Sequence, residues 1–281
     1  MKPLGNVAIV GVGLIGGSIG LALRKRGLAE NVIGIGRRQV TLRIARRVGA
    51  VSHTTVDLAK GVAEANLVIV CTPIGKVVEH VRQAARCCRP GTLITDVGSA
   101  KQVIVAALDA GLSGDCRFLG GHPIAGGEQA GPSYAQADLF ESRVAVLTPT
   151  KNTRAEDFDL LEEFWQGLGA VVLQMSPDEH DRALAVSSHL PHMAAAALAV
   201  TLTEKYFRVA GTGVLDATRL AAGDPNLWKQ ILLLNRENAL VALEQFGANL
   251  FNLHAALRDR DDAALERFLI SAKKNRDALG S

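Results

Sequence analysis

The chain has 281 residues, a length that suits one large domain or two moderate ones and allows a substantial hydrophobic core. With 48% hydrophobic and 21% charged residues, it has the composition of a globular protein, which excludes a disordered chain. A net charge of only +3 and an aromatic content of 4% argue against a nucleic-acid partner, because such proteins need a strongly basic or base-stacking surface.

The segment 7–38 has the pattern of a dinucleotide-binding unit. A short apolar run leads into GVGLIG at 11–16, and an amphipathic segment and a second apolar run follow. Gly11 permits a tight turn, Gly13 lets the backbone approach a pyrophosphate, and Gly16 lets the helix pack closely on the strand. We expect the pyrophosphate on free N–H groups at the helix N-terminus. The residues expected to contact the dinucleotide in this unit are Gly11, Gly13, Leu14, Ile15, Gly16, Arg37 and Arg38.

The sequence has no segment typical of a membrane or secreted protein. Residues 7–23 carry no charge, but they contain five glycines and fall short of the ~20 residues that a membrane span needs. The N-terminus starts with strand-like residues and lacks the pattern of a signal peptide. The four cysteines form no CxxC or metal-ligand spacing, so we expect a reduced, cytoplasmic protein without a metal site.

Strand and helix patterns alternate up to about residue 175, which predicts an α/β domain over 1–175. Such alternation is typical of a mostly parallel sheet covered by helices on both faces, as in a Rossmann-like domain. Beyond the first unit, strands are expected at 67–71, 92–97, 144–147 and 170–173 and in a segment that ends at 118–120, and helices at 74–88 and about 101–110.

From Ser176 to the C-terminus the pattern is helical and rich in Ala and Leu, which predicts an all-helical second domain over 176–281. Ser176 is expected to cap the first helix, with Pro177 at its first position and Glu179 completing a capping box. That helix should run to about residue 204 with a kink at Pro191. These helices carry more apolar surface than they need among themselves, which favours a homodimer. Further helices are expected at about 225–256 and 261–279.

Ligands of parallel sheets bind beyond the carboxyl ends of the strands, so the residues that follow the predicted strands are candidates for function. His122 follows one of these strands in a glycine-rich turn and is the best candidate for proton transfer, because histidine titrates near neutral pH. Ser99 either caps the next helix or hydrogen-bonds the histidine or the substrate. Lys101 is expected to be a solvated helix residue, and Cys71 to end a buried strand without acting as a nucleophile.

In the helical domain, His189 and His192 share a helix face, with Ser188 beside them and His180 about two turns earlier. Histidines at this spacing can bind a metal, but no carboxylate or cysteine pattern accompanies them, so polar lining of a substrate cleft is favoured. Arg219 lies among apolar and small residues. Its guanidinium suits a carboxylate ligand, and a structural ion pair with Asp216 or Asp224 is the alternative.

Taken together, these motifs resemble those of the prephenate/arogenate (cyclohexadienyl) dehydrogenases over about residues 6–275. The motifs are GVGLIGGSIGLAL, CTPI, DVGSAK, GGHPIAGGEQAG, SSHLPHMAAAAL and DATRLAAGDPNLW. The resemblance implies a Rossmann-like domain followed by a helical dimerisation domain, in an oxidoreductase of tyrosine biosynthesis. It implies oxidative decarboxylation of prephenate or arogenate with hydride transfer to NAD or NADP, which gives 4-hydroxyphenylpyruvate or tyrosine.

The same resemblance implies roles for individual residues. His122 matches the catalytic histidine of the family, Ser99 the serine beside it, and Arg219 the arginine that binds a substrate carboxylate. The other positions that match the family's substrate cleft are Glu128, His180, Ser188, His189, His192 and Trp228. The positions that match the family's cofactor cleft, besides the glycine motif, are Cys71, Thr72, Pro73 and Gly98.

One position departs from the usual fingerprint of an NAD-binding enzyme. That fingerprint has an acidic residue about 20 residues after the glycines, where it holds the ribose 2′-hydroxyl. Here Gly36-Arg37-Arg38 stands at the end of the second predicted strand instead. Since arginine pairs well with a phosphate, the sequence favours NADP over NAD as the cofactor.

Two other functions remain open at this point. One is a different two-domain nicotinamide enzyme, such as an imine reductase or a β-hydroxyacid dehydrogenase, because fold alone does not separate these. The HPIAG and SHLPH blocks favour the prephenate/arogenate group. The other is a dinucleotide-sensing module without catalysis, which the presence of His122 at a strand end argues against.

Overall fold

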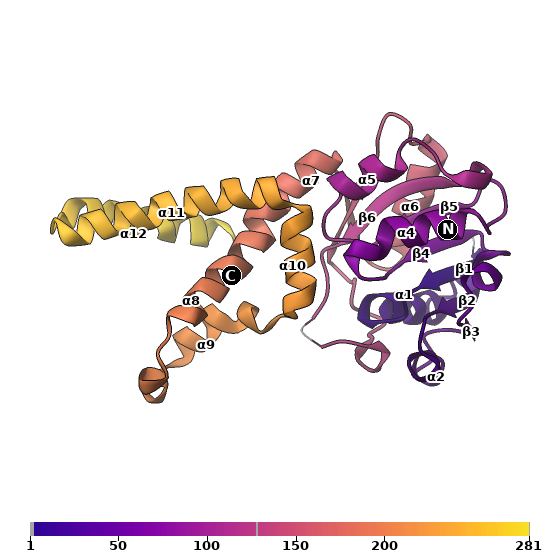
Figure 1. The fold of residues 1–281 in the computed structure, drawn as a ribbon, viewed down its shortest axis with the longest axis horizontal. Coiled ribbons are helices and arrows are strands. Elements are labelled where there is room, and N and C mark those ends of the chain that lie inside the picture. The colour runs from indigo at the N-terminus through magenta and orange to yellow at the C-terminus, as the bar shows by residue number, and fades with distance from the viewer. Residues whose placement is uncertain (1–2, 128, 281) are drawn as a thin grey trace.

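The computed structural model describes residues 3–127 and 129–280, which form a sheet-containing part and a helical part (Figure 1). The sheet has eight strands in the order β3-β2-β1-β4-β5-β6-β7-β8. All neighbouring strands are parallel except β6 and β7, which confirms the predicted mostly parallel sheet. The strands are β1 (Leu4–Val10), β2 (Ala29–Ile35), β3 (His53–Thr55), β4 (Leu67–Val70), β5 (Leu93–Asp96), β6 (Arg117–Pro123), β7 (Val144–Thr148) and β8 (Val171–Gln174).

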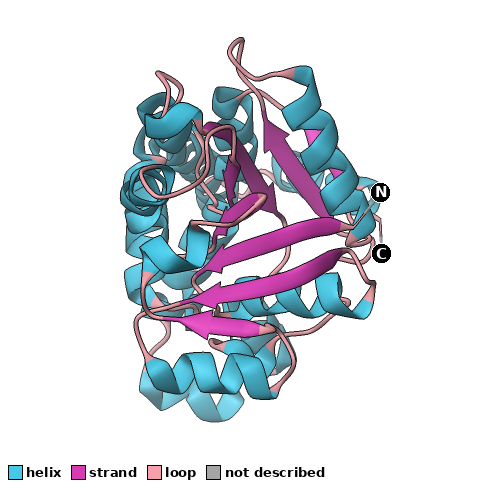
Figure 2. Cartoon of the chain, turned by 90° about the vertical axis from the view of Figure 1, so that its right-hand side faces the viewer, coloured by secondary structure: helices cyan, strands magenta, loops and turns pink. Residues whose placement is uncertain are grey.

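Helices surround the sheet, as Figure 2 shows, and each face of the sheet has its own apolar core. Successive side chains of a strand point to opposite faces, so in β1 Val7 and Ile9 enter one core while Ala8 and Val10 enter the other. This double burial explains why the strand runs are continuously apolar. The helices of this part are α1 (Leu14–Lys25), α2 (Gln39–Arg47), α3 (Leu58–Val62), α4 (Val77–Ala85), α5 (Gln102–Leu108) and α6 (Ala155–Gly167).

Strand β6 differs from its prediction, because it continues through His122 to Pro123 and does not end at Gly120. His122 therefore lies in a strand and not in a turn, paired antiparallel with Val146 of β7. The glycines before it serve close packing: a Cβ on Gly120 would lie 2.6 Å from Oγ1 of Thr148.

The helical part begins at α7 (Pro177–Leu184), and no strand follows in the described residues up to 280. Ser176 caps α7 as predicted, accepting a hydrogen bond from the Glu179 backbone N–H at 3.1 Å. The long helix predicted to 204 is interrupted by a π-helical turn, η4 (Ala185–His189), just before Pro191. Since proline has no N–H, the backbone there cannot keep the regular helical hydrogen bond. The remaining elements are α8 (Leu190–Thr201), η5 (Glu204–Val209), α9 (Thr212–Thr218), η6 (Arg219–Ala222), α10 (Pro225–Leu234), α11 (Arg236–Arg258) and α12 (Asp262–Ala278).

Helices α11 and α12 lie side by side and extend away from the sheet (Figure 1). Large apolar side chains stay exposed along them, among them Phe251, which is 66% exposed, and Ile270, which is 60% exposed. Among the described residues one helical run, Pro177–Thr201, is long and apolar enough to cross a membrane by length and composition. This run packs against α5 and α11, and its residues His180 and Asp181 are fully buried there.

Candidate active site

His122 lies near the carboxyl end of β6 and is 9% exposed. Its Nδ1 atom lies 2.8 Å from Nε2 of His180 on α7. Nδ1 of His180 lies in turn 2.7 Å from Oδ1 of Asp181. Because both His180 and Asp181 are fully buried, this path of hydrogen bonds runs from the sheet into the helical part without contact with solvent. The burial of His180 does not fit its prediction as a cleft-lining residue, since both of its ring nitrogens are already occupied.

The Asp181 carboxylate also holds the start of α5. It accepts hydrogen bonds from the backbone N–H groups of Lys101 at 2.7 Å and Gln102 at 3.0 Å. On its other side, the Asp181 carbonyl accepts a hydrogen bond from the Asn235 side chain at 2.7 Å. Of the two interpretations of Ser99, capping of this helix is therefore wrong: α5 begins at Gln102, and the Asp181 carboxylate, 79 residues further along the sequence, takes the capping role. Ser99 is partly exposed between β5 and α5.

Lys101 is fully buried, so its prediction as a solvated residue is wrong. Its ammonium group donates to Oδ2 of Asp96 at 2.5 Å and to the carbonyl of Gly121 at 2.9 Å. Asp96 is only five residues before Lys101, but this spacing does not show that both side chains are fully buried. Burial lowers the pKa of Lys101, while the carboxylates of Asp96 and Asp181 favour its charged form.

The surroundings of His122 disfavour its protonation. Burial lowers the pKa of His122 well below its ordinary value, and His180, Lys101 and His189 lower it further. Burial also lowers the pKa of His189, to about 4. His122 is therefore a neutral imidazole at physiological pH, the form that can accept a proton.

The residues of the SHLPH segment come together with Trp228, as the sequence indicates. The His192 ring stacks on the Trp228 indole at 3.6 Å with an interplanar angle of 9°, and the His189 ring lies edge-on to it at 6.3 Å. His189 is fully buried, and its Nε2 atom has no hydrogen-bond partner among the described residues. Ser188 is half-buried in the π-helical turn η4. A buried nitrogen without a partner is costly, so it points to a missing polar ligand or water.

Arg219 begins η6, which packs against α8, and its side chain is exposed. Asp224, one of the two ion-pair partners considered for it, caps α10 by accepting hydrogen bonds from the backbone N–H groups of Asn226 at 2.7 Å and Leu227 at 3.0 Å. Glu128 lies outside the described residues.

The glycine turn between β1 and α1 has the form that a bound pyrophosphate needs. Gly11 has φ +98°, and a Cβ there would lie 2.6 Å from the carbonyl oxygen of Cys71. Above Gly13, the N-cap of α1, a Cβ would meet nothing within 4 Å, and no side chain caps the helix. The first N–H groups of α1, which include those of Leu14 and Ile15, therefore start a helix beside open space.

A cavity of about 260 Å³ opens beside this turn. Leu14 lines it together with Gly126 and Gly127 of the loop after β6 and with Tyr134. The cavity thus joins the glycine motif to the loop that follows His122.

The other residues predicted at the cofactor cleft lie at neighbouring strand ends. Cys71, Thr72 and Pro73 follow β4, and Oγ1 of Thr72 lies 2.9 Å from Nδ1 of His80. Burial raises the pKa of the Cys71 thiol, as expected of a residue that is not a nucleophile. Gly98 follows β5, where its N–H donates to the Asp96 carboxylate at 2.8 Å.

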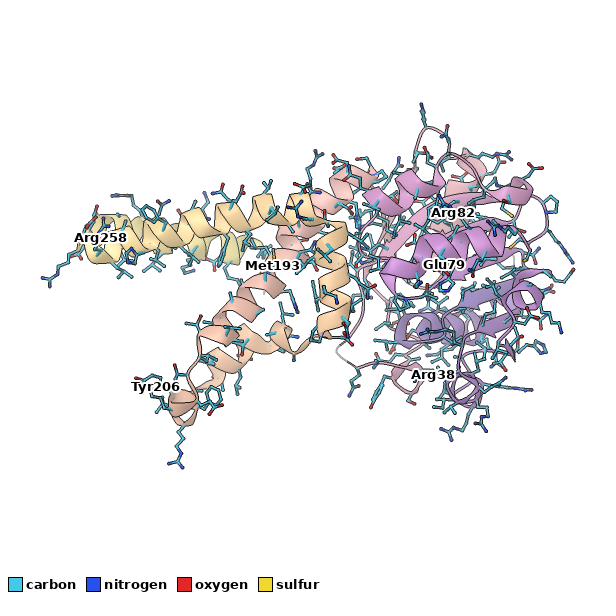
Figure 3. All side chains as sticks on the ribbon, viewed as in Figure 1. Arg38, Glu79, Arg82, Met193, Tyr206 and Arg258 are labelled. Carbon is cyan, nitrogen blue, oxygen red and sulfur yellow. The ribbon has the colours of Figure 1, made fainter. Side chains whose placement is uncertain are left out.

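Arg37 and Arg38 lie just beyond β2, both exposed. Arg38 is the N-cap residue of α2, and Figure 3 labels it beside that helix in the sheet-containing part. Both residues thus follow the carboxyl end of β2, the end of a parallel strand beyond which ligands of this fold bind.

The family follows from comparison with known proteins. The family described as "Prephenate dehydrogenase, nucleotide-binding domain" matches residues 19–174, and "Prephenate dehydrogenase, dimerization domain" matches residues 176–271. The chain belongs to the prephenate dehydrogenase family. This confirms the resemblance based on the sequence motifs, and the two matches meet at residue 175, where β8 has ended and α7 is about to begin.

Relatives in this family match the chain over nearly its whole length. The prephenate dehydrogenase of Bacillus subtilis is 33% identical over 98% of this chain and 76% of its own length. The cyclohexadienyl dehydrogenase of Zymomonas mobilis is 31% identical over 97% of this chain and 96% of its own length.

Solved structures of the family share the whole fold. Prephenate dehydrogenase from Aquifex aeolicus, in complex with hydroxyphenyl propionate and NAD+, is 33% identical, with a TM-score of 0.92 over 99% of this chain and 98% of its own. A Synechocystis arogenate dehydrogenase, at 29% identity, has a TM-score of 0.82 over 98% of this chain and 99% of its own. A 3-hydroxyisobutyrate dehydrogenase from Mycobacterium tuberculosis, at 16% identity and a TM-score of 0.52, shares the fold alone.

Proposed function

We propose that this prephenate dehydrogenase family member catalyses the oxidative decarboxylation of prephenate or arogenate, with His122 as the general base. The observation that carries the proposal is the neutral imidazole of His122 at the carboxyl end of β6. Its Nδ1 atom is engaged by His180, so Nε2 is the atom left to meet a substrate hydroxyl.

The chemistry requires one proton acceptor and one hydride acceptor. The hydrogen on ring carbon C4 leaves as a hydride while the C4 hydroxyl gives its proton to His122. The ring carboxylate leaves as CO2, its bonding electron pair makes the ring aromatic, and the ring oxygen takes the proton back from His122 to give the phenol. Aromatisation supplies the driving force. General-base catalysis of this kind contributes about 10²–10⁴-fold to the rate, which is the share expected of His122.

A nicotinamide dinucleotide, when bound, supplies the hydride acceptor. The glycine turn fits such a group, because Gly13 leaves the start of α1 open and uncapped. Cys71, Thr72, Pro73 and Gly98 stand at the neighbouring strand ends and would flank it. Arg37 and Arg38 would pair with a 2′-phosphate, so we propose NADP as the preferred cofactor.

Arg219 would bind a substrate carboxylate, with Ser188, His189, His192, Trp228 and Glu128 as the other residues proposed to form the substrate cleft. Two observations support this. The stack of His192 on Trp228 offers an aromatic surface to a ligand, and the unpartnered Nε2 of the buried His189 offers a polar atom. Ser99, partly exposed after β5, is proposed to contact the substrate or His122 once the ligand is bound.

We further propose that two copies of the chain form a homodimer through the helical part. The family's dimerization domain spans residues 176–271, and large apolar side chains are exposed on α11 and α12. A patch of this kind on a stable protein usually marks an interface. Light scattering at working concentration should give twice the mass of the chain, and a monomer would contradict the proposal.

A turnover assay tests the function directly. Prephenate and arogenate are each offered with NAD and with NADP, and both reduced nicotinamide and released CO2 are measured. Equal amounts of the two products with at least one substrate are expected. Absence of turnover in all four combinations would contradict the proposed function.

A further inference from the structure

The tautomer of His122 is set by residues that do not reach the substrate. A neutral imidazole carries one N–H, and the nitrogen without it is the one that can accept a proton. His122 can act as a base through Nε2 only if its own N–H is on Nδ1. Its partner at Nδ1, His180, therefore decides whether His122 is competent.

The direction of the hydrogen bonds can be worked out from the carboxylate. An ionised carboxylate only accepts, so Nδ1 of His180, 2.7 Å from Oδ1 of Asp181, carries the proton. A neutral His180 then presents a lone pair on Nε2. That lone pair accepts the Nδ1–H of His122, at 2.8 Å, and the lone pair of His122 is left on Nε2.

The Asp181 carboxylate is held in its place by other hydrogen bonds. Two backbone N–H groups, those of Lys101 and Gln102, donate to its oxygens, and the side chain of Asn235, the residue between α10 and α11, donates to the Asp181 carbonyl. Asp181 is thus fixed from α5, α7 and the junction of α10 and α11 at once, and it is fully buried, so water cannot replace its bonds.

We propose that Asp181 is a positioning residue for the reaction: acting through His180, it holds His122 in the tautomer whose Nε2 atom accepts the proton. The proposal rests on the proposed role of His122 as the general base. It gives Asp181 a second task besides capping α5, and it links the helical part of the chain to proton transfer on the sheet.

A double-mutant cycle separates this positioning task from the cap. In Asp181→Asn, an amide NH2 group replaces one carboxylate oxygen and faces N–H groups that are themselves donors. We expect kcat to fall by about 10²–10⁴-fold, with KM changed less. His180→Phe keeps an aromatic ring at this position and leaves the Asp181 cap of α5 in place, but it removes the hydrogen bonds that connect Asp181 to His122. If Asp181 acts through His180, the double variant should be no slower than His180→Phe alone. Independent, multiplying losses would overturn the proposal.

A matched control is Asp261→Asn, which changes the aspartate that caps α12 at the Ala264 N–H, 2.9 Å away, far from His122. It should leave kcat unchanged. The pH profile of each variant is recorded as well. The titratable and charged groups around His122 are His180, Lys101 with its partner Asp96, and His189. Of these, only His180 should carry an effect of the Asp181 variant to the acid limb of the His122 profile.

Histidine nitrogen NMR tests the tautomer without substrate, so its result stands even if neither prephenate nor arogenate is turned over. In the unmodified protein, we expect His122 with a proton on Nδ1 and a lone pair on Nε2, assigned by comparison with His122→Asn. In Asp181→Asn, the signal of the opposite tautomer should grow. A proton on Nε2 of His122 in the unmodified protein would overturn the proposal.

Discussion

The ammonium group of Lys101 lies 2.5 Å from the carboxylate of Asp96, and both side chains are fully buried. The pair lies close to His122, because Lys101 also donates a hydrogen bond to the carbonyl of Gly121, which precedes His122 in β6. A buried ion pair of this kind adds little net stability as a pair, but the loss of one partner leaves an uncompensated charge inside the protein.

Lys101→Met should therefore lower the free energy of unfolding by about 3–5 kcal/mol, measured by urea denaturation. The control is Lys76→Met, which removes a pair with Glu79 whose side chains are 61% and 48% exposed, and its effect on stability should be far smaller because solvent screens such a pair. In folded Lys101→Met, the loss of a nearby positive charge should raise the pKa of His122. Equal losses of stability in the two variants would contradict the expectation that the buried Lys101–Asp96 pair is more costly to break than an exposed pair.

The turnover of the unmodified enzyme should fall only in acid. A histidine acts as a base only in its neutral form, and burial holds the pKa of His122 well below its ordinary value of about 6.5. The acid limb of kcat should therefore lie below pH ~6.5. His122→Asn should lower kcat by about 10²–10⁴-fold and abolish that limb, while His254→Asn, at an exposed position on α11, should change neither. Survival of the limb in His122→Asn would show that another group is the base.

Arg219→Ala should act mainly through KM, because a substrate carboxylate is present in both the ground state and the transition state. The loss of a hydrogen bond to a charged group costs about 1.5–3 kcal/mol, which corresponds to an increase in KM of about 10- to 150-fold. Steady-state kinetics compare this variant with His122→Asn, whose loss should fall on kcat. A normal KM in the Arg219→Ala variant would show that Arg219 does not bind the substrate.

Arg37 and Arg38 should discriminate between the two cofactors, because only NADP carries a 2′-phosphate for them to pair with. Replacing both with Gln should weaken NADP binding by at least about tenfold and NAD binding much less, measured by calorimetry without substrate. The matched control replaces Arg46 and Arg47, two exposed arginines at the other end of α2, and removes the same charge. Tighter binding of NAD than of NADP by the unmodified protein would refute the preference.

Local patterns in the sequence determined much of this protein. The glycine motif, the apolar strand runs and the Ser176 cap are recognisable because each depends on residues within one or two turns of the chain. Gly11 needs a backbone conformation that favours glycine, with φ +98°, and the strands between two helical layers must be apolar on both faces. His122 was found from the sequence because strand ends are where ligands of parallel sheets bind.

Only the tertiary structure decided what surrounds His122. The sequence places Lys101 in solvent, offers capping of α5 as one of two roles for Ser99, and places His180 in the lining of a cleft, and each of these interpretations uses neighbours along the chain. In the fold, distant residues meet: His180 is 58 residues from His122, and the Asp181 carboxylate caps a helix that starts 79 residues earlier. A buried charge or a histidine nitrogen bonds to whatever the packing of the sheet and helices places within 3 Å, and one-dimensional spacing does not contain that distance.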